Sequence, residues 1–405
     1  MSLSAEAEVR RTALILASAQ AVIGSAVPIV LSMGALAGQY LLGADKSLAT
    51  LPVTSFNLGV ALGAIPAAAI VRALGQRQGF QFGTILTAAG GGITTLALFR
   101  GEFWLFVIGA MLVGIGGSFV QQFRFAAADN APPQFKAKAI SLVLAGGIVT
   151  AILGPQIVIF TRDLLEPTLF AGAFVAIIGL AVVGAVILSF LRVHEPLPPA
   201  SRMSVPKTSL WTVVRRPKFA AALICGVCTY MLMSFVMTGA PLAMVGCGFS
   251  VDQATLGISW HVMAMFGPSF FTGRIIQRFG AERVVAVGVL LLIVCALVAL
   301  SGIQLWQFWT SLILLGLGWN FGFIGATAIV ASSYRPEEKA KAQGFHDFVL
   351  FGSVAFASLM SGIVYNAYGW EMLNWIVFPV CAICLAALAW LFAIKRSGAA
   401  ELSAH

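Results

Sequence analysis

Long apolar runs separated by short polar connections dominate the pattern of this 405-residue chain. A helix needs about 20 apolar residues to cross a bilayer, and these runs are long enough. They are apolar without the alternation of a membrane strand, which argues against a β-barrel. We therefore predict an all-α membrane protein with twelve transmembrane helices, at 12–36, 48–71, 79–99, 103–128, 138–161, 168–191, 219–242, 253–275, 283–302, 305–332, 342–365 and 371–394.

The polar connections repeat at about half the chain length. The stretch 133–139 reads Pro-Gln-Phe-Lys-Ala-Lys-Ala, and 336–342 reads Pro-Glu-Glu-Lys-Ala-Lys-Ala, 203 positions later. The turn at 72–77, Arg-Ala-Leu-Gly-Gln-Arg, is matched by Gln-Arg-Phe-Gly-Ala-Glu-Arg at 277–283, 205 positions later. Self-similarity at a fixed offset indicates one unit that has been duplicated.

The repeat suggests how the chain is divided. The longest connection, 192–218, is rich in Pro, Ser and basic residues, and it follows the sixth apolar run. It is too short and too polar to form a further folded domain. We expect an N-terminal six-helix half at 1–191, a linker at 192–218 and a C-terminal six-helix half at 219–405.

Composition supports a membrane protein. Sixty per cent of the residues are apolar and ten per cent are charged, and the mean hydropathy is +0.96. Soluble domains carry about 25% charged residues. The 42 glycines suit a bundle whose helices approach one another closely in lipid.

The distribution of basic residues predicts an orientation. If the N-terminus is inside, the inner segments and helix ends hold 20 of the 24 Lys and Arg residues. The outer side keeps Lys46, Arg100 and Arg162, and Arg124 lies inside an apolar run. Cytoplasmic loops of membrane proteins are enriched in Lys and Arg, so we expect both termini in the cytoplasm.

Two six-helix halves with basic hairpins resemble the major facilitator superfamily. The family motif after helix two is Gly-x-x-x-Asp-Arg-x-Gly-Arg-Arg. The first copy of this chain keeps Gly75 and Arg77, with Arg72 in the place of the acid, and the second keeps Gly273, Arg278, Gly280 and Arg283, with Gln277 in that place. The resemblance covers the whole chain and implies a secondary transporter with its site between the halves.

Several family features linked to proton coupling differ here. Drug antiporters of the family carry an arginine where this chain has Ala110, and many symporters carry an acid in helix one, where 12–36 has none. The acids nearest the apolar runs are Asp129 and Asp347. We therefore expect transport to need no buried carboxylate in the N-terminal core, and a uniporter remains open.

Polar side chains inside apolar runs are the candidates for substrate binding, because buried polar groups in lipid usually face a cavity or a partner. Arg124 and Gln121 would form a donor-rich patch, or Arg124 would pair with Asp129 or extend to the interface. His261 and Asn320 could bond substrate or serve packing, and Trp319 offers a flat apolar face. The substrate-binding candidates are Gln121, Arg124, His261, Trp319 and Asn320.

A second group lies at the turns and inner helix ends, where the two halves would have to meet when the carrier faces outward. Arg278 and its first-half counterpart occupy symmetry-related turns, and Asp347 follows a histidine at the start of helix eleven. The candidates for a role in gating are Gly75, Arg77, Arg278, Gly280, Asp129, His346 and Asp347.

Other chemistry is weakly indicated. Two Cys-x-x-Cys pairs, at 225–228 and 381–384, lie in apolar runs without nearby His or acid, so we interpret them as packing residues rather than metal ligands. No Gly-x-x-x-x-Gly-Lys-Ser/Thr loop occurs, so ATP is not the expected energy source. No nucleophile–base constellation points to an enzyme.

A closer resemblance rests on the stretches Gly-Trp-Asn-Phe-Gly-Phe-Ile-Gly-Ala-Thr at 318–327 and Gln-Gly-Phe-His-Asp-Phe-Val-Leu-Phe-Gly at 343–352. They are similar to bacterial facilitator permeases, most of all to those that import riboflavin. Riboflavin is uncharged, with a flat ring and a polyol. Aromatic residues could stack on the ring, while amides and a guanidinium bond its oxygens and nitrogens.

These observations predict a permease of the bacterial inner membrane that imports a small organic solute. The expected partners are that substrate and the lipid bilayer, with no nucleic acid, cofactor or metal and with the protein as a monomer. The alternatives are a proton-coupled drug or metabolite exporter of the same fold and a membrane receptor or scaffold without transport.

Overall fold

The computed structural model describes residues 3–129, 136–192, 209–335 and 338–403. Most of the expected linker, much of the hairpin at 133–139 and the side chain of Asp129 lie outside the described residues. Within those ranges the regular elements are all α-helices. The prediction of an all-α membrane fold is confirmed.

The helices divide into two groups in chain order. We call α1 to α8 the first half and α9 to α16 the second half. The first half comprises α1 (Leu3–Ile23), α2 (Ala26–Leu41), α3 (Leu51–Leu74), α4 (Gln76–Arg100), α5 (Phe103–Val120), α6 (Phe123–Asp129), α7 (Lys136–Thr161) and α8 (Ala171–Ser189). The second comprises α9 (Leu210–Val214), α10 (Pro217–Gly246), α11 (Val251–Phe266), α12 (Ser269–Phe279), α13 (Ala281–Leu300), α14 (Leu305–Ala331), α15 (Lys339–Trp375) and α16 (Val377–Ser403).

Eleven stretches of the described chain are long and apolar enough to span a membrane as one piece. The predicted run at 253–275 is the exception, because it is broken at Gly267 and Pro268 into α11 and α12, of 16 and 11 residues. Proline has no N–H and its ring clashes with the carbonyl four residues earlier, which ends a helix. The expectation of an uninterrupted helix there is wrong, although a broken helix fills the same place.

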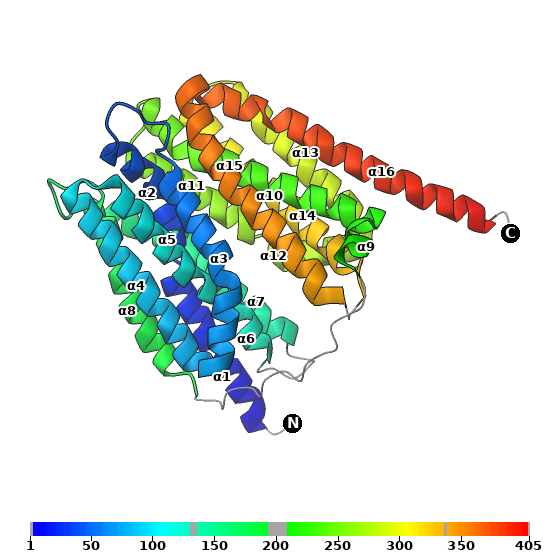
Figure 1. Cartoon of the computed structure of the whole chain (residues 1–405), viewed down its shortest axis with the longest axis horizontal. Coiled ribbons are helices and arrows are strands. Elements are labelled where there is room, and N and C mark those ends of the chain that lie inside the picture. Colours follow the sequence, from blue (N-terminus) through cyan, green and yellow to red (C-terminus); the bar gives the residue numbers. More distant parts are fainter. Residues whose placement is uncertain (1–2, 130–135, 193–208, 336–337, 404–405) are drawn as a thin grey trace.

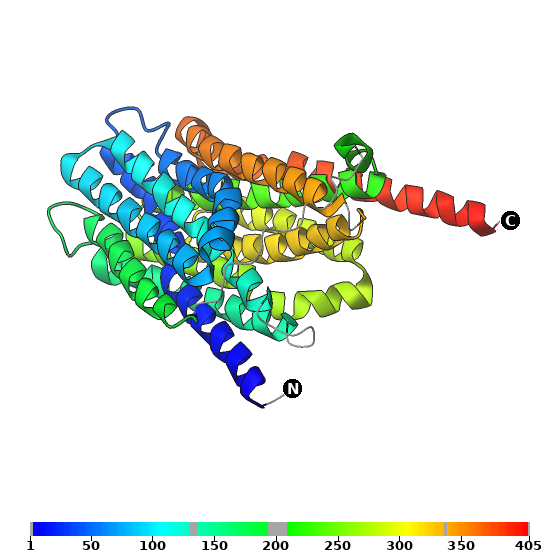
Figure 2. The same cartoon turned by 60° about the horizontal axis from the view of Figure 1, so that its bottom comes forward.

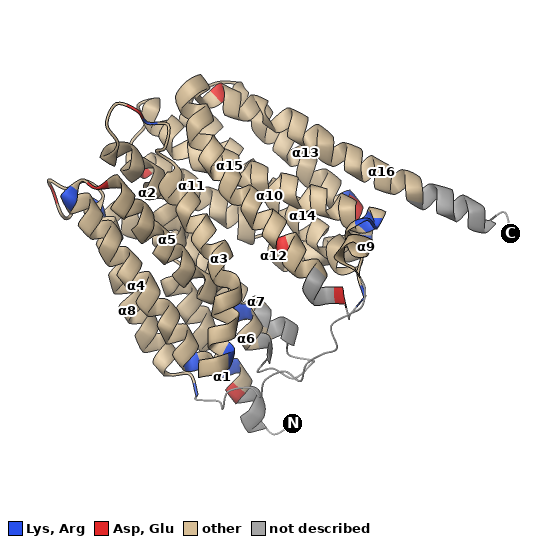
Figure 3. Cartoon of the chain, viewed as in Figure 1, with Lys and Arg blue, Asp and Glu red and all other residues tan. Residues whose placement is uncertain are grey.

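The two halves lie side by side and their ribbons diverge toward the end where both termini lie (Figures 1 and 2). Lys, Arg, Asp and Glu residues gather at the helix ends, and the middles of the helices carry almost none (Figure 3). This separation of charge from the helix middles is what a bilayer requires of its spanning segments.

Contacts between the halves define what we call the closed end. The hydroxyls of Thr54 and Ser358 lie 3.0 Å apart, one from each half. Arg162, just after α7, approaches Asp252 in the first turn of α11, with 2.7 Å between the charged atoms. Because α3 and α11 start at this end, the turns that follow α3 and α12 lie at the opposite end, which we call the open end.

Both halves use the same close helix crossing. A Cβ added to Gly114 of α5 would collide with the Phe56 carbonyl of α3, and one added to Gly316 of α14 would collide with the His261 carbonyl of α11. Small residues allow such backbone approach in a membrane bundle. The two crossings therefore have the same close backbone approach, as the repeat seen in the sequence predicts.

A bidentate ion pair fixes the start of α10 to the start of α15. The Arg216 guanidinium donates to both carboxylate oxygens of Glu338, at 2.7 and 2.8 Å, and the Arg335 N–H donates to the same carboxylate at 3.0 Å. The hydrogen bonds from Arg216 are the main reason why the pKa of Glu338 is lowered to about 2. The same pair raises the pKa of Arg216.

This pair predicts a particular dependence of stability on pH. A lowered carboxyl pKa contributes stability that is complete above the ordinary value of 4.5 and is lost as the pH falls toward about 2. We expect Glu338→Gln to lower the thermal unfolding temperature equally at pH 5 and pH 8, and less at pH 2.5. Glu102→Gln, whose carboxylate caps no helix end, is the matched control. A Glu338→Gln effect that differs between pH 5 and pH 8 would contradict this assignment.

Candidate functional site

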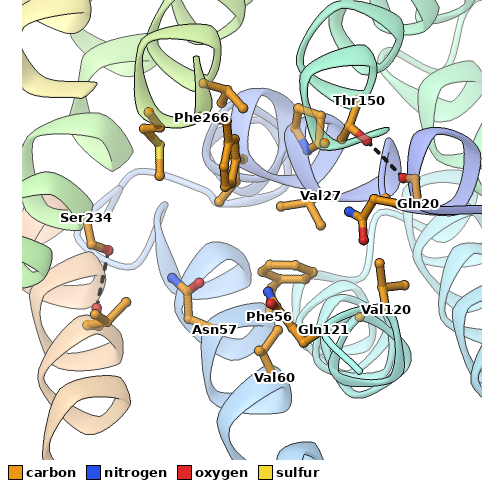
Figure 4. A pocket seen from close by; sticks show the side chains of 18 of the residues that line it. Gln20, Val27, Phe56, Asn57, Val60, Val120, Gln121, Thr150, Ser234 and Phe266 are labelled. Carbon is orange, nitrogen blue, oxygen red and sulfur yellow. Dashed lines mark hydrogen bonds between the residues drawn. The ribbon is translucent and has the colours of Figure 1, made fainter. Parts of the chain in front are cut away.

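A cavity lies between the two halves, near the middle of the bundle (Figure 4). It holds about 1300 Å³ of empty space, part of it open to solvent. The lining comes from α1, α2, α3, α5, α6 and α7 of the first half and α10, α11 and α15 of the second. Helices of both halves therefore contribute to the wall of this cavity.

The wall from the first half is rich in hydrogen-bonding groups. Gln20 of α1, Asn57 of α3 and Thr150 of α7 line it, with Gln121 at the end of α5 and Arg124 on α6. The Thr150 hydroxyl donates to the Gln20 carbonyl at 2.9 Å, which fixes α7 against α1. The side-chain amides of Asn57 and Gln121 are drawn beside the open space in Figure 4. This wall can donate to and accept from a polar ligand at several points.

The wall from the second half is mainly aromatic and sulfur-containing. Its side chains are apolar apart from the hydroxyls of Tyr230 and Ser234, and the latter donates to the Val354 carbonyl at 3.4 Å. Phe266 points toward the middle of the cavity (Figure 4). Aromatic faces and polarisable thioethers suit a flat, apolar ligand surface. The residues of this wall are Tyr230, Met233, Ser234, Met237, Val262, Met265, Phe266, Phe351 and Val354.

Arg124 is the one basic residue in the lining of this cavity, and no carboxylate is found in that lining among the described residues. Its guanidinium lies 4.8 Å from the ring centroid of Phe125. It is also within electrostatic reach of Tyr230 and Asp347 across the cavity. A cation in the lining with amides beside it favours a neutral or anionic ligand over a cationic one.

The five substrate-binding candidates from the sequence divide between two places. Gln121 and Arg124 line the cavity. Trp319 lies behind the lining, edge-on to Tyr230 at 5.3 Å and to Phe266 at 6.2 Å between ring centroids. It also stacks on Phe323 at 5.1 Å. Trp319 can therefore support the aromatic wall through the two rings that form it.

His261 and Asn320 are fully buried and lie outside the lining of the cavity. The His261 Nδ1 donates to the Leu312 carbonyl at 2.8 Å, which joins α11 to α14. The Asn320 amide bonds to Met265, Ser269 and Thr272 on either side of the break between α11 and α12. Both side chains connect helices of the second half.

The gating candidates at the turns share one backbone shape. Gly75 joins α3 to α4 with φ 80° and ψ 163°, and Gly280 joins α12 to α13 with φ 88° and ψ 147°. Positive φ of this kind favours glycine, so both turns need that residue. Arg77 follows the first turn, and Arg278 precedes the second with its guanidinium 5.2 Å from the Phe279 ring centroid.

The remaining gating candidates lie at the open end of the second half and at the end of α6. His346 is buried, and its Nδ1 lies 2.9 Å from the exposed carboxylate of Asp347. Gln343, one turn earlier, is exposed and donates to the Tyr334 hydroxyl at 2.8 Å. Asp129 is the last residue of α6, and its side chain is outside the described part of the chain.

Sequence reasoning missed several residues of the cavity. Gln20 and Asn57 could have been found, because each is an uncharged polar side chain in the middle of an apolar run. Tyr230, Phe266 and Phe351 carry no such signal, because aromatic residues are frequent along the whole chain. Their place in the wall depends on which face each helix turns toward the other half.

The two Cys-x-x-Cys pairs come together inside the second half. Cys225 of α10 and Cys384 of α16 are buried, and the Cys225 thiol lies 3.7 Å from the Cys384 carbonyl oxygen. Cys228 and Cys381 are buried as well, whereas Cys247 is exposed. In the part of the chain that the structure describes, His, Cys, Asp and Glu form no group able to hold a metal ion.

Comparisons with known proteins agree with this architecture. The family model described as Major Facilitator Superfamily matches residues 12–298 and 222–404. The solved structure titled "In meso crystal structure of the POT family transporter PepTSo" has a TM-score of 0.71, covers 96% of this chain and 98% of that chain, and is 13% identical. At that identity the likeness concerns the fold alone.

Curated relatives span almost the whole chain. The riboflavin transporter RfnT of Brucella anthropi is 46% identical over 391 residues, which are 96% of this chain and 98% of that protein. Two uncharacterised MFS-type transporters of Bacillus subtilis are more distant. YddS is 26% identical over 95% of this chain and 91% of its own length, and YdeG is 27% identical over 94% and 92%.

Proposed function

The chain belongs to the major facilitator superfamily, and we propose that it is a riboflavin importer. Membership of that family makes it a multi-pass secondary transporter that moves a small molecule by alternating access. The similarity to a riboflavin transporter over nearly the full length supports the choice of substrate. The proposal covers the vitamin, the direction of transport and the residues that bind it.

The observation that carries the proposal is the difference between the two walls of the cavity. The first half presents amides and a guanidinium, and the second presents aromatic rings and thioethers. Riboflavin has the same two-sided character, with a flat ring whose edge carries carbonyl and N–H groups and with a polyol chain. We propose that the ring lies against Tyr230, Phe266 and Phe351, and that Gln20, Asn57, Gln121 and Arg124 bond its polar edge and polyol.

The proposed orientation follows from the basic residues. Lys and Arg favour the cytoplasmic side of membrane proteins, so the open end, where the termini lie, would face the cytoplasm. The contacts at the closed end would then separate the cavity from the outside. In this arrangement the carrier is ready to release its substrate inward, and the bacterial inner membrane is its expected location. We propose that it works as a monomer and without nucleic acid.

The turns at Gly75 and Gly280 would act when the carrier faces outward. The two turns share one backbone shape, and each has an arginine two residues away, Arg77 after the first turn and Arg278 before the second. We propose that these residues, with Asp129, His346 and Asp347, hold the inner helix ends together in that state. Loss of these residues would slow turnover and change the equilibrium affinity for the substrate much less.

Binding of riboflavin to the purified protein tests the proposed substrate. Stacking on aromatic rings quenches flavin fluorescence, so we expect saturable quenching at micromolar riboflavin. Proteoliposomes should then take up riboflavin without an imposed proton gradient, because no carboxylate lines the described cavity. Absence of saturable quenching would remove the vitamin assignment and leave the transporter fold in place. If uptake requires a proton gradient, the uniport mechanism is wrong, while riboflavin stays the proposed substrate.

A further inference from the structure

The second half contains a helix break beside the cavity. Met265 and Phe266, the last two residues of α11, line the cavity, and α12 begins at Ser269 after the break. In a continuous helix the N–H of Ser269 would bond the Met265 carbonyl, but Ser269 starts a new helix. Of the residues of α12, Thr272 alone is buried. This short helix is therefore held to the bundle at few points.

Asn320 of α14 bonds to both sides of this break. Its Nδ2 donates to the Met265 carbonyl at 2.6 Å and to the Ser269 hydroxyl at 2.8 Å. The Thr272 hydroxyl lies 2.6 Å from its Oδ1 and 2.8 Å from the Pro268 carbonyl, and it can donate to either oxygen. The side chain is fully buried, so water does not compete for these bonds. One amide thus connects the last turn of α11 to the first turn of α12.

The first half has no such connection, although its helices cross in the same way. Counting four residues on from Gly114 and from Gly316 gives Ser118 and Asn320. Counting seven on from Phe56 and from His261 gives Gly63 and Pro268. The Ser118 hydroxyl donates to Ile115 of its own helix at 2.7 Å, and α3 continues unbroken past Gly63. Of these two corresponding helices, the one in the second half is broken and clamped, whereas α3 is not.

We propose that Asn320 is a positioning residue that couples the substrate cavity to the movement of α12. A ligand against Phe266 and Met265 would act on the end of α11, and the Asn320 amide would pass this displacement to Ser269 and Thr272. α12 leads directly to Arg278 and the turn at Gly280, at the open end. The coupling rests on the proposed transport function, and the clamp itself can be tested without any substrate.

Hydrogen–deuterium exchange of the purified protein without ligand tests the clamp. Asn320→Leu keeps the approximate size of the side chain and removes all three bonds. We expect amide exchange in segment 269–279 to rise about ten-fold, while exchange in α13 is unchanged, because each lost bond to a buried group is costly. Ser118→Ala, at the equivalent place of the first half, is the matched control and should leave both segments unchanged.

A second pair of variants tests the clamp even if Asn320→Leu does not fold. Thr272→Val removes one bond of the clamp and should raise exchange in segment 269–279 about three-fold, whereas Thr272→Ser keeps the hydroxyl and should match the wild type. If Thr272→Val leaves exchange within two-fold of the wild type, the clamp is contradicted even when Asn320→Leu fails to fold. The same conclusion follows if folded Asn320→Leu exchanges like the wild type.

Transport distinguishes a positioning role from a structural one. We expect Asn320→Leu to lower the riboflavin turnover of folded protein about ten-fold at saturating substrate, with affinity within three-fold of the wild type. A purely structural role would reduce the amount of folded protein and leave turnover per folded molecule unchanged, which would overturn the coupling. If the wild type does not bind riboflavin, the proposed substrate is wrong, and the exchange experiment still decides whether the clamp exists.

Discussion

Arg124→Ala should weaken riboflavin binding about ten- to hundred-fold. The guanidinium is the one cation in the lining of the described cavity, and it lies beside the amide of Gln121. A hydrogen bond to a charged group contributes about 1.5–3 kcal/mol, and about 1.4 kcal/mol corresponds to a factor of ten in affinity. The riboflavin affinity of Arg124→Lys should lie between those of the wild type and Arg124→Ala, because lysine keeps the charge and loses the planar fork of donors. Titration of riboflavin fluorescence measures all three proteins.

The matched control removes the same charge from the same end of the bundle. Arg278 lies on α12, outside the lining of the cavity. Arg278→Ala should keep affinity within a few-fold of the wild type while slowing uptake in proteoliposomes. If Arg124→Ala binds as tightly as the wild type, the polar wall does not recognise the substrate through this residue. An unchanged uptake rate in Arg278→Ala would rule out its proposed part in gating.

Asp252→Asn should open the closed end. A cysteine placed at the contact between the halves should then be labelled about ten times faster than in the protein that keeps Asp252. The Arg162 Nη1 and the Asp252 Oδ1 are both shielded from solvent, and they face each other across the two halves without the alignment of a hydrogen bond. Asp252→Asn removes the charge attraction between the halves, while Arg162 keeps its ion pair with Asp163 of its own half at 2.9 Å. About 1.4 kcal/mol shifts the population of the open arrangement ten-fold.

A cysteine at Thr54, at the contact between the halves, reports opening by its rate of reaction with a maleimide. Cys247, the exposed native thiol, is replaced by serine in every protein compared. Glu8→Gln is the control, because the ion pair of Glu8 with Arg192 lies within the first half. The exchanged pair Arg162→Asp with Asp252→Arg should return labelling toward the slow rate. Equal labelling of Asp252→Asn and the wild type would show that this ion pair does not hold the end closed.

The fold was predictable because its signals are local and repeated. Each apolar run sets its own helix, and the duplicated turns set the relation between the halves. The run 253–275 was expected to be one helix because it was read by its hydrophobicity alone. Gly267 and Pro268 were visible in the sequence, but the same pair at Gly154 and Pro155 lies inside the unbroken α7, so the pair alone does not decide. Apolar composition shows that a segment lies in the membrane, whereas the backbone chemistry decides whether it crosses in one piece.

The site was harder to predict, because a polar residue in an apolar helix has two possible partners. Arg124 and Gln121 face the cavity, whereas Asn320 satisfies its amide on the neighbouring helix. The sequence indicates that each of these polar side chains needs a hydrogen-bond partner, but it does not show which group lies close enough to be that partner. That depends on the rotation of each helix about its axis, which is set by side chains far away along the chain.

The glycine crossings have a consequence for the way such a protein can diverge after duplication. Gly114 and Gly316 admit only a hydrogen atom in place of a side chain, because a backbone carbonyl lies against each. The side chains of the two cavity walls already differ, with amides on one side and rings on the other. A mutation can therefore alter one wall while the joint between the helices stays the same. Helix packing and substrate preference depend on different residues of this protein and can change independently.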